Sequence, residues 1–273
     1  MSGPDHPNPS AAPVQKVRLR YAKRGRLRFA SHRDVARVFE RALRRAGVPM
    51  AHSQGYSPRP RISWLGAVPT GVSSDAEYVE LQLAQRVDPA ALLAELRGAL
   101  VAGIEPLEAV EAGGSALADR LQASRWRLEF PGVPAGRLRE AVSALLDADH
   151  VEVRRMGKDG LRTLDAREPL VRAEVLDGAG TGALGDGGVP VADDGPKNAD
   201  PYGILVVVVR QTTPVVRPDD VLNALRVVAD QDLPDAEATR LEQGRLDDAG
   251  GLVDPLAPEG ATAGPRRGSP APG

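Results

Sequence analysis

The pattern of apolar and polar positions predicts strands and helices that alternate along the first 112 residues. Val17, Leu19 and Tyr21 occupy every second position, which is the period of a strand. We expect this alternation to resume at Leu27 and Phe29 after a basic turn. Further strands are predicted at 61–65, 77–83 and 104–110, and helices at 31–47 and 88–100. The order strand, helix, strand, strand, helix, strand is that of a ferredoxin-like unit.

A weaker form of the same pattern recurs in the second half of the chain. It predicts strands near 126–130, 150–155, 202–210 and 238–246, and helices at 135–146 and 218–229. The expected fold class is therefore α+β, with two tandem ferredoxin-like (βαββαβ) units, the second degenerate and carrying an insertion. The expected boundaries are a disordered N-terminus at 1–13, a basic unit at 14–112, a second unit at 123–246 with a mobile insertion at 177–199, and a disordered tail at 247–273.

Both ends of the helix at 31–47 are marked in the sequence. Ser31 is a good N-cap, and Asp34 three residues later completes a variant of the capping box. Gly47 fits the position that ends a helix. An apolar stripe at helical spacing is expected to face the core, made of Val35, Val38, Phe39, Ala42, Leu43 and Ala46. A different face carries four arginines at steps of four, four and three, namely Arg33, Arg37, Arg41 and Arg44.

Charge singles out the same part of the chain. Fourteen Lys or Arg residues and two acids lie between Val14 and Trp64, although the whole chain has a formal charge of −2. A local basic surface suggests a polyanionic partner, and RNA is the first candidate. The alternative is a solvated helix face in an arginine-rich composition, because only four of the 35 basic residues are lysine.

The segment 52–61 continues the basic block as an irregular loop, since it contains Pro58, Pro60 and Gly55. Its tyrosine and arginines are suited to stacking on unpaired bases and to forked contacts with phosphates. The alternative for the tyrosine is a ring packed on the core. The expected RNA-binding residues are Arg33, Arg37, Arg41, Arg44, Gln54, Tyr56, Arg59 and Arg61.

Few residues point to catalysis or metal binding. The four histidines have no metal-ligand spacing, and the sequence has no P-loop and no GxGxxG motif after a strand. Ser31 and Asp34 are better explained as caps than as partners of His32 in a triad. No catalytic residue is therefore assigned, and His32 and His52 are the only candidates for work beside a phosphate. No metal site is expected.

The absence of cysteine has a mechanistic consequence. This chain cannot ligate an iron–sulfur cluster through thiolates, so we expect no cofactor on it. Zero cysteines also fit a cytoplasmic protein. The sequence has no run of eighteen apolar residues and no apolar core of a signal peptide, so no membrane association is expected.

One stretch resembles a known family. The resembling residues are Arg28-Phe29, Ser31-His32, Asp34, the run ERALRRAG, Ser53-Gln54-Gly55, Pro58, Pro60 to Ser63, Pro69, Gly71 and Glu77-Tyr78, with weaker echoes near Arg217-Pro218 and Thr239-Arg240. The sequence is similar here to the bacterial radical-SAM-linked protein family, a domain of unknown function that is often fused behind a radical SAM module. The resemblance implies a radical SAM protein as partner. Any cluster would then sit on that partner.

These observations lead to an expected function. We expect an accessory RNA-binding protein that works with a separately encoded radical SAM enzyme in the modification of tRNA or rRNA. One alternative is an RNA-processing or RNA-modifying enzyme in its own right, since paired ferredoxin-like units carry such chemistry elsewhere. Another is a protein-only adaptor for the radical SAM partner, and a third, least supported, is a carrier of small molecules.

Overall fold

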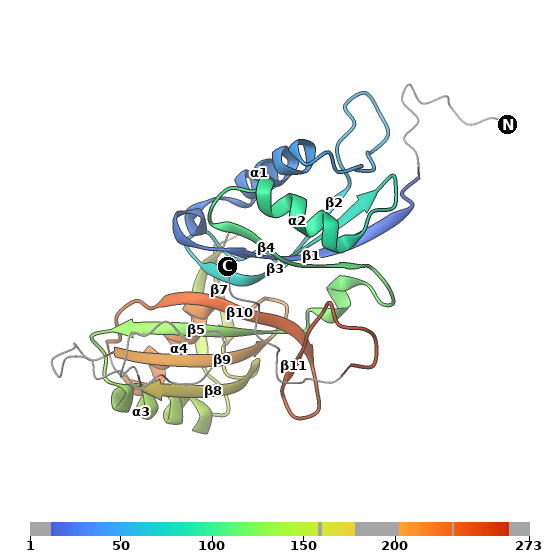
Figure 1. Cartoon of the computed structure of the whole chain (residues 1–273). Coiled ribbons are helices and arrows are strands. Elements are labelled where there is room, and N and C mark those ends of the chain that lie inside the picture. Colours follow the sequence, from blue (N-terminus) through green and yellow to red (C-terminus); the bar gives the residue numbers. More distant parts are fainter. Residues whose placement is uncertain (1–11, 158–159, 178–201, 231, 262–273) are drawn as a thin grey trace, which may run out of the picture. The chain divides into compact units, whose positions relative to one another are not determined.

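The computed structural model describes residues 12–157, 160–177, 202–230 and 232–261, which form a mixed α+β fold (Figure 1). The described residues contain four α-helices and a large, mostly antiparallel sheet, so the α+β class is confirmed. They divide into two compact units. The first holds the described residues up to Leu121 together with 240–242 and 255–260, and the second holds the rest. None of the helices in these ranges is long and apolar enough to cross a membrane.

The first unit contains the six elements that the sequence pattern predicts, in the predicted order. Its elements are β1 (Gln15–Lys23), η1 (Gly25–Phe29), α1 (His32–Arg45), β2 (Ile62–Leu65), β3 (Ser73–Leu83), α2 (Pro89–Ala99), β4 (Ile104–Glu111) and η2 (Leu117–Arg120). The strands lie in the order β4-β1-β3-β2, and every neighbouring pair is antiparallel. Leu19 of β1 lies opposite Val79 of β3 and Ala109 of β4, which fixes the register of the central strand.

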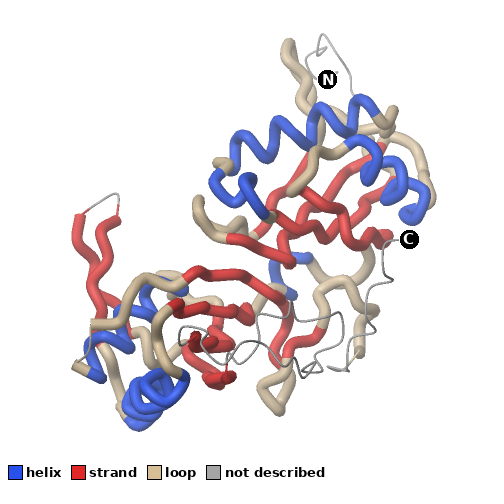
Figure 2. Tube along the Cα trace, turned by 60° about the vertical axis from the view of Figure 1, so that its left-hand side comes forward, coloured by secondary structure: helices blue, strands red, loops and turns tan. Residues whose placement is uncertain are grey.

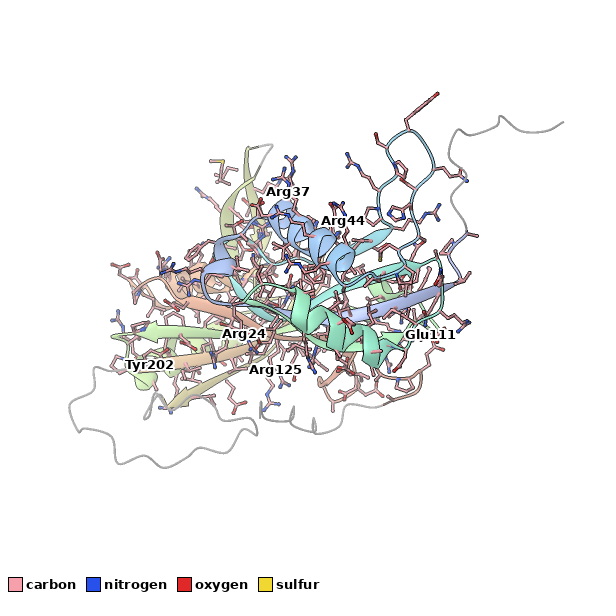
Figure 3. The ribbon with its side chains drawn as sticks, turned by 45° about the horizontal axis from the view of Figure 1, so that its top comes forward. Arg24, Arg37, Arg44, Glu111, Arg125 and Tyr202 are labelled. Carbon is pink, nitrogen blue, oxygen red and sulfur yellow. The ribbon has the colours of Figure 1, made fainter. Side chains whose placement is uncertain are left out.

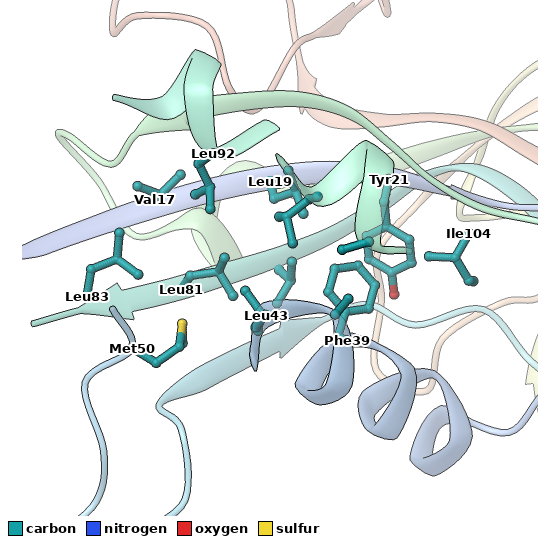
Figure 4. Close-up of a cluster of buried hydrophobic side chains, with 14 of the residues drawn as sticks. Val17, Leu19, Tyr21, Phe39, Leu43, Met50, Leu81, Leu83, Leu92 and Ile104 are labelled. Atoms are coloured by element: carbon teal, nitrogen blue, oxygen red, sulfur yellow. The ribbon is translucent and has the colours of Figure 1, made fainter. Parts of the chain in front are cut away.

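Alternation decides which side of β1 faces the helices. Val17, Leu19 and Tyr21 are buried in one cluster with Phe39 and Leu43 of α1. Figure 2 shows both helices of this unit on one face of its strands, and Figure 4 shows Phe39 beside Tyr21. Their ring centroids are 4.8 Å apart in an edge-to-face arrangement. Because successive side chains of a strand point to opposite faces, Lys16, Arg18 and Arg20 of β1 face away from α1.

The second unit repeats this order of strands. Its elements are β5 (Ala123–Pro131), α3 (Ala135–Asp147), β6 (Glu152–Gly157), β7 (Gly160–Asp165), β8 (Leu170–Asp177), β9 (Tyr202–Arg210), α4 (Pro218–Ala229), β10 (Glu237–Leu246) and β11 (Leu252–Val253). The strands lie in the order β10-β5-β9-β8, and β11 pairs with β10. Strands β6 and β7 form a separate antiparallel hairpin, which projects from the unit in Figure 2. Without this hairpin, the elements from β5 to β10 follow the order strand, helix, strand, strand, helix, strand.

The structure corrects three expectations. The alternation at Leu27 and Phe29 belongs to the 3-10 helix η1, because Gly25 adopts a φ of +56° and turns the chain. The strand expected at 150–155 is β6, which lies in the separate hairpin and not in the large sheet. Strands β7 and β8 had not been predicted.

The tail expected to be disordered from 247 instead contains β11 and the buried Leu256 as far as it is described. Its apolar side chains leave water by packing on the sheet. Two further expectations concern residues that the structure mostly does not describe. The insertion expected at 177–199 lies outside the described residues except for Asp177, and so do the first eleven residues of the N-terminus.

A buried ion pair joins distant parts of the sequence within the first unit. Arg240 of β10 binds the carboxylate of Glu77 on β3 and donates to the carbonyl of Gly66 at 2.6 Å. The Val68 N–H donates to the other oxygen of Glu77 at 3.2 Å. Burial, and secondarily the charge of Glu77, raises the pKa of Tyr21 well above its usual range. The two partners of the ion pair, Glu77 and Arg240, belong to Glu77-Tyr78 and Thr239-Arg240, two stretches that carry the family resemblance.

Candidate nucleic-acid interface

Helix α1 begins and ends where its sequence indicates. The Ser31 hydroxyl accepts the Asp34 N–H at 3.3 Å, and it donates to the Asp34 carboxylate at 2.6 Å. This hydroxyl bond, with smaller effects of Arg37 and Arg33, lowers the pKa of Asp34. At the other end, the N–H of Gly47 bonds to the Arg44 carbonyl and that of Val48 to the Leu43 carbonyl, which is a Schellman motif. Gly47 has the required positive φ of +63°.

Burial separates the two faces of α1 as predicted. Val35, Phe39, Ala42 and Leu43 are buried against the strands, and Val38 and Ala46 are half-buried. The four predicted arginines Arg33, Arg37, Arg41 and Arg44 are all exposed. Figure 3 shows Arg37 and Arg44 pointing outward from α1, away from the sheet. The helix therefore presents a row of guanidinium groups to solvent.

Little within the described structure neutralises this row. Arg37 lies 3.6 Å from the Asp34 carboxylate, and both groups are more than half exposed. Arg41 and Arg44 take part in no hydrogen bond or ion pair among the described residues. Exposed pairs of this kind contribute about 0–1 kcal/mol, so internal neutralisation is weak. The row keeps most of its positive potential for an external partner.

The loop after α1 has a regular base and an exposed tip. Its two sides are held by the bond from the Ser53 N–H to the Arg59 carbonyl at 2.8 Å and by a bridge between His52 and Pro60. The Arg61 N–H bonds to the Ala51 carbonyl at 2.8 Å, which attaches the base of the loop next to β3. Figures 1 and 3 show this loop projecting on the same side of the sheet as α1. Hydrogen bonds across the loop therefore hold its tip away from the core.

The predicted loop residues differ in exposure. Tyr56 is 93% exposed, so the alternative that its ring packs on the core is wrong. Gln54 and Arg59 are also exposed, whereas Arg61 at the base is half-buried. The structure thus brings α1 and the tip of the loop to one side of the first unit, with Arg61 the least accessible member of the predicted set.

The two histidine candidates have separate surroundings among the described residues. The exposed imidazole of His32 packs edge-on against Trp64 of β2, with 5.3 Å between ring centroids. His52 is exposed in the loop, and no contact among the described residues joins it to His32. Within the described ranges, no cluster of three His, Cys, Asp or Glu residues could hold a metal ion. Ser31 and Asp34 act as caps, as expected.

Sequence reasoning missed two aromatic groups beside this surface. Phe29 is 60% exposed, and the guanidinium of Arg28 lies 4.9 Å from the centre of its ring. Trp64 packs on Phe39 at 5.2 Å as well as on His32. The position of Phe29 beside the basic turn could have indicated that its ring is exposed. We had instead assigned Phe29 to the buried side of a strand.

Two basic residues of β1, Lys16 and Arg18, do not join the row. Arg18 is buried on the opposite face of β1, where it donates to Glu80 at 3.2 Å and to the Ser115 carbonyl at 2.6 Å. Lys16, two residues earlier, pairs with the same Glu80 at 3.4 Å. The basic block is thus divided between two faces of the sheet.

Comparison with known proteins adds a family but no activity. No curated protein matches the chain. Residues 16–218 match a family described as "Uncharacterized protein conserved in bacteria (DUF2344)". This match covers more than half of the 273 residues and includes α1, the projecting loop and most of the second unit. The chain therefore belongs to the uncharacterised bacterial family DUF2344.

Proposed function

We propose that this chain is an accessory RNA-binding protein that works with a separately encoded radical SAM enzyme, in the modification of tRNA or rRNA. The observation that best supports the proposal is the row of four exposed arginines on α1. From Arg33 to Arg44 the helix rises about 16 Å at 1.5 Å per residue, enough to cross several backbone phosphates. An arginine offers forked donors that match phosphate oxygens.

The projecting loop adds a feature that duplex binding alone does not need. Tyr56 offers both faces of an exposed ring at its tip. Such rings stack on unpaired bases whatever their sequence, while nearby arginines contact the backbone. We therefore propose a target with single-stranded nucleotides next to a phosphate backbone, such as the loop of a structured RNA.

In the proposed fold of two tandem ferredoxin-like units, this surface would lie on a helix and a loop and not on the sheet. Four-stranded RNA-binding domains commonly stack bases on the outer face of their sheet. In the first unit that face is partly covered, because Ala76 and Tyr78 are buried there with Leu117 and Leu256. The helix face is thus the more accessible surface for a polyanion.

The partner is proposed from the family resemblance and from the chemistry of the chain. Without cysteine, this protein would leave the iron–sulfur cluster and the radical step to the other polypeptide. We propose that it acts in the cytoplasm, carries no cofactor, and binds RNA for the enzyme. An RNA-modifying or RNA-processing activity of its own and a protein-only adaptor are the competing outcomes of the experiment below.

A double charge reversal tests the proposal. We expect Arg37→Glu with Arg41→Glu to weaken binding to total cellular RNA strongly. The slope of affinity against salt should also fall, because a protein that makes fewer phosphate contacts releases fewer counterions when it binds. Titrations at several salt concentrations measure both quantities. The matched control is Arg86→Glu with Arg172→Glu, two exposed arginines outside α1 that change the net charge by the same amount.

The outcomes separate the candidates. RNA binding that is equal in the wild type and in the α1 variant would contradict the proposal. If the same variant also fails to bind the radical SAM partner, the surface is a protein interface and the adaptor is correct. A new modification or cleavage of RNA by the purified chain alone, lost in His32→Ala or His52→Ala, would favour an enzyme.

A further inference from the structure

We propose that the first unit has a second binding site, a pocket for a small organic monoanion on the face of its sheet opposite α1. A cavity of about 390 Å³ lies there between strands β1, β2 and β3 and the segment 112–118. This volume is within the range of small-molecule sites, roughly 300–1,000 Å³. The site does not depend on the proposed RNA binding, because its residues face the other side of the sheet.

The polar end of the pocket has one excess positive charge. Arg18 and Lys16 both contact Glu80, so two cations share one carboxylate. The side chain of Arg18 is only 5% exposed and is held in place by the carbonyls of Gly113 and Ser115. Lys16 is 53% exposed and, among the described residues, pairs with Glu80 alone, so its ammonium group can turn toward a ligand. One unmatched cation selects a monoanion over a neutral or cationic molecule.

The remaining lining is mostly apolar. Leu65 of β2 and Leu117 of η2 form part of the wall together with three alanines, and the Ser63 hydroxyl lies at the rim. Burying apolar atoms against such a wall is favourable by about 25 cal/mol per Å². The ligand class that fits is therefore a carboxylate or a similar monoanion attached to a compact apolar body.

The wall of the pocket is held by other contacts, so it needs little reorganisation to bind. Arg120 donates to the Ala257 carbonyl at 2.8 Å and to the Ser115 hydroxyl at 3.0 Å. The carboxylate of Glu259 accepts the Ser115 N–H at 2.6 Å. A Cβ at Gly114 would lie 2.1 Å from a carboxylate oxygen of Glu259, and the φ of +64° at this position also favours glycine. Preformed sites of this kind lose less conformational entropy on binding.

Three probes of the same shape test the charge selection. Indole-3-acetate carries a carboxylate, indole-3-acetamide is its neutral counterpart, and tryptamine is a cation. We expect ligand-observed NMR titration of the full chain to show binding of the acetate about tenfold tighter than that of the amide, the range of one charge-assisted hydrogen bond, and no binding of tryptamine. Equal binding of all three probes, or no binding of the acetate, would overturn the proposal.

Two variants locate the site. Lys16→Met removes the available cation and should weaken acetate binding about tenfold toward that of the amide. Ser63→Leu fills the rim from an exposed position of an edge strand and should abolish binding of both probes. Arg86→Met, at an exposed arginine that pairs with Glu111 outside the pocket, is the control and should bind as the wild type does. Acetate binding unchanged in both pocket variants would place the probe elsewhere and refute the site.

Discussion

At the scale of single residues, arginine has two opposite roles in this chain. Arg18 and Arg240 are buried, and each links a carboxylate to backbone carbonyls. Arg41 and Arg44 lie on a helix face with no such partner among the described residues. The side chain is the same, and the element that carries it decides the role. An arginine whose donors are already bound inside the protein has few left for a ligand.

The exposed ring of Tyr56 gives the clearest single-residue test of how RNA would bind. We expect Tyr56→Ala to leave thermal stability unchanged, because a ring that is 93% exposed contributes little to the core. Binding to single-stranded RNA should weaken by about 1–3 kcal/mol, the usual contribution of one stacked base, while duplex binding changes less. Fluorescence anisotropy with matched single-stranded and duplex RNAs measures both. Equal losses for the two RNAs would contradict stacking by Tyr56.

The buried pair of Glu77 and Arg240 predicts a large effect on stability. Glu77→Gln leaves the buried guanidinium of Arg240 without its anion, and we expect the free energy of unfolding to fall by about 3–5 kcal/mol. The same substitution at Glu174 is the control, since its contact with Arg172 is exposed and should contribute about 0–1 kcal/mol. Urea denaturation of both variants compares them. Similar small losses would show that Glu77 is dispensable.

At the scale of elements, α1 could be predicted closely because its signals are local. Ser31, Asp34 and Gly47 mark its ends, and its apolar period marks its buried face, all within seventeen positions. The exposure of the arginine row follows from the same period. Which basic residues lie beside that row depends on the strand instead, because the side of β1 that faces α1 is set by packing.

The C-terminal glycine of α1 offers a matched comparison of two helices. Gly47→Ala forces a side chain into a φ of +63° and should destabilise the protein by about 1 kcal/mol. Gly98→Ala in α2 places the same methyl group at an exposed helical position with open space around it, and it should stabilise by about 0.5–1 kcal/mol. Thermal denaturation measures the change in stability of each variant. Changes of the same sign in both variants would contradict the capping role of Gly47.

The extra hairpin of β6 and β7 shows why other elements could not be predicted. Its second strand, Gly160–Asp165, has an exposed Leu161 and only one buried side chain, Leu164, so its apolar pattern resembles that of a loop. The hairpin is held by the buried contact of Arg155 with Asp220 on α4. These residues are 65 positions apart, and no local pattern reports such a pair.

At the scale of the whole molecule, the first unit is assembled from separate stretches of chain. Residues 240–242 and 255–260 belong to it although more than a hundred positions separate them from Leu121. Sequence reasoning placed its end at 112, because the six predicted elements stop there. The contacts of Leu256 and Glu259 depend on the folded sheet and on the segment 113–120, and so they could not be predicted from periodicity.

Removal of the late segment tests this description. We expect a chain that ends after Asp254 to lose about 2–5 kcal/mol of stability, because it lacks the buried Leu256 and leaves Arg120 without two of its carbonyl partners. A chain that ends after Ala261 retains these contacts and controls for the loss of the last twelve residues. Chemical denaturation compares the two. Equal stability would show that 255–260 is not an integral part of the unit.

The discontinuous first unit also has a consequence for synthesis on the ribosome. A contiguous N-terminal domain can fold while the rest of the chain is still being translated. Here Glu77 is synthesised 163 residues before Arg240, and Leu117 precedes Leu256 by 139 residues. At roughly 5–20 residues per second, the nascent unit waits about ten to thirty seconds with a charged group and an apolar sheet face uncovered. During that interval it is a candidate client for chaperones that bind nascent chains.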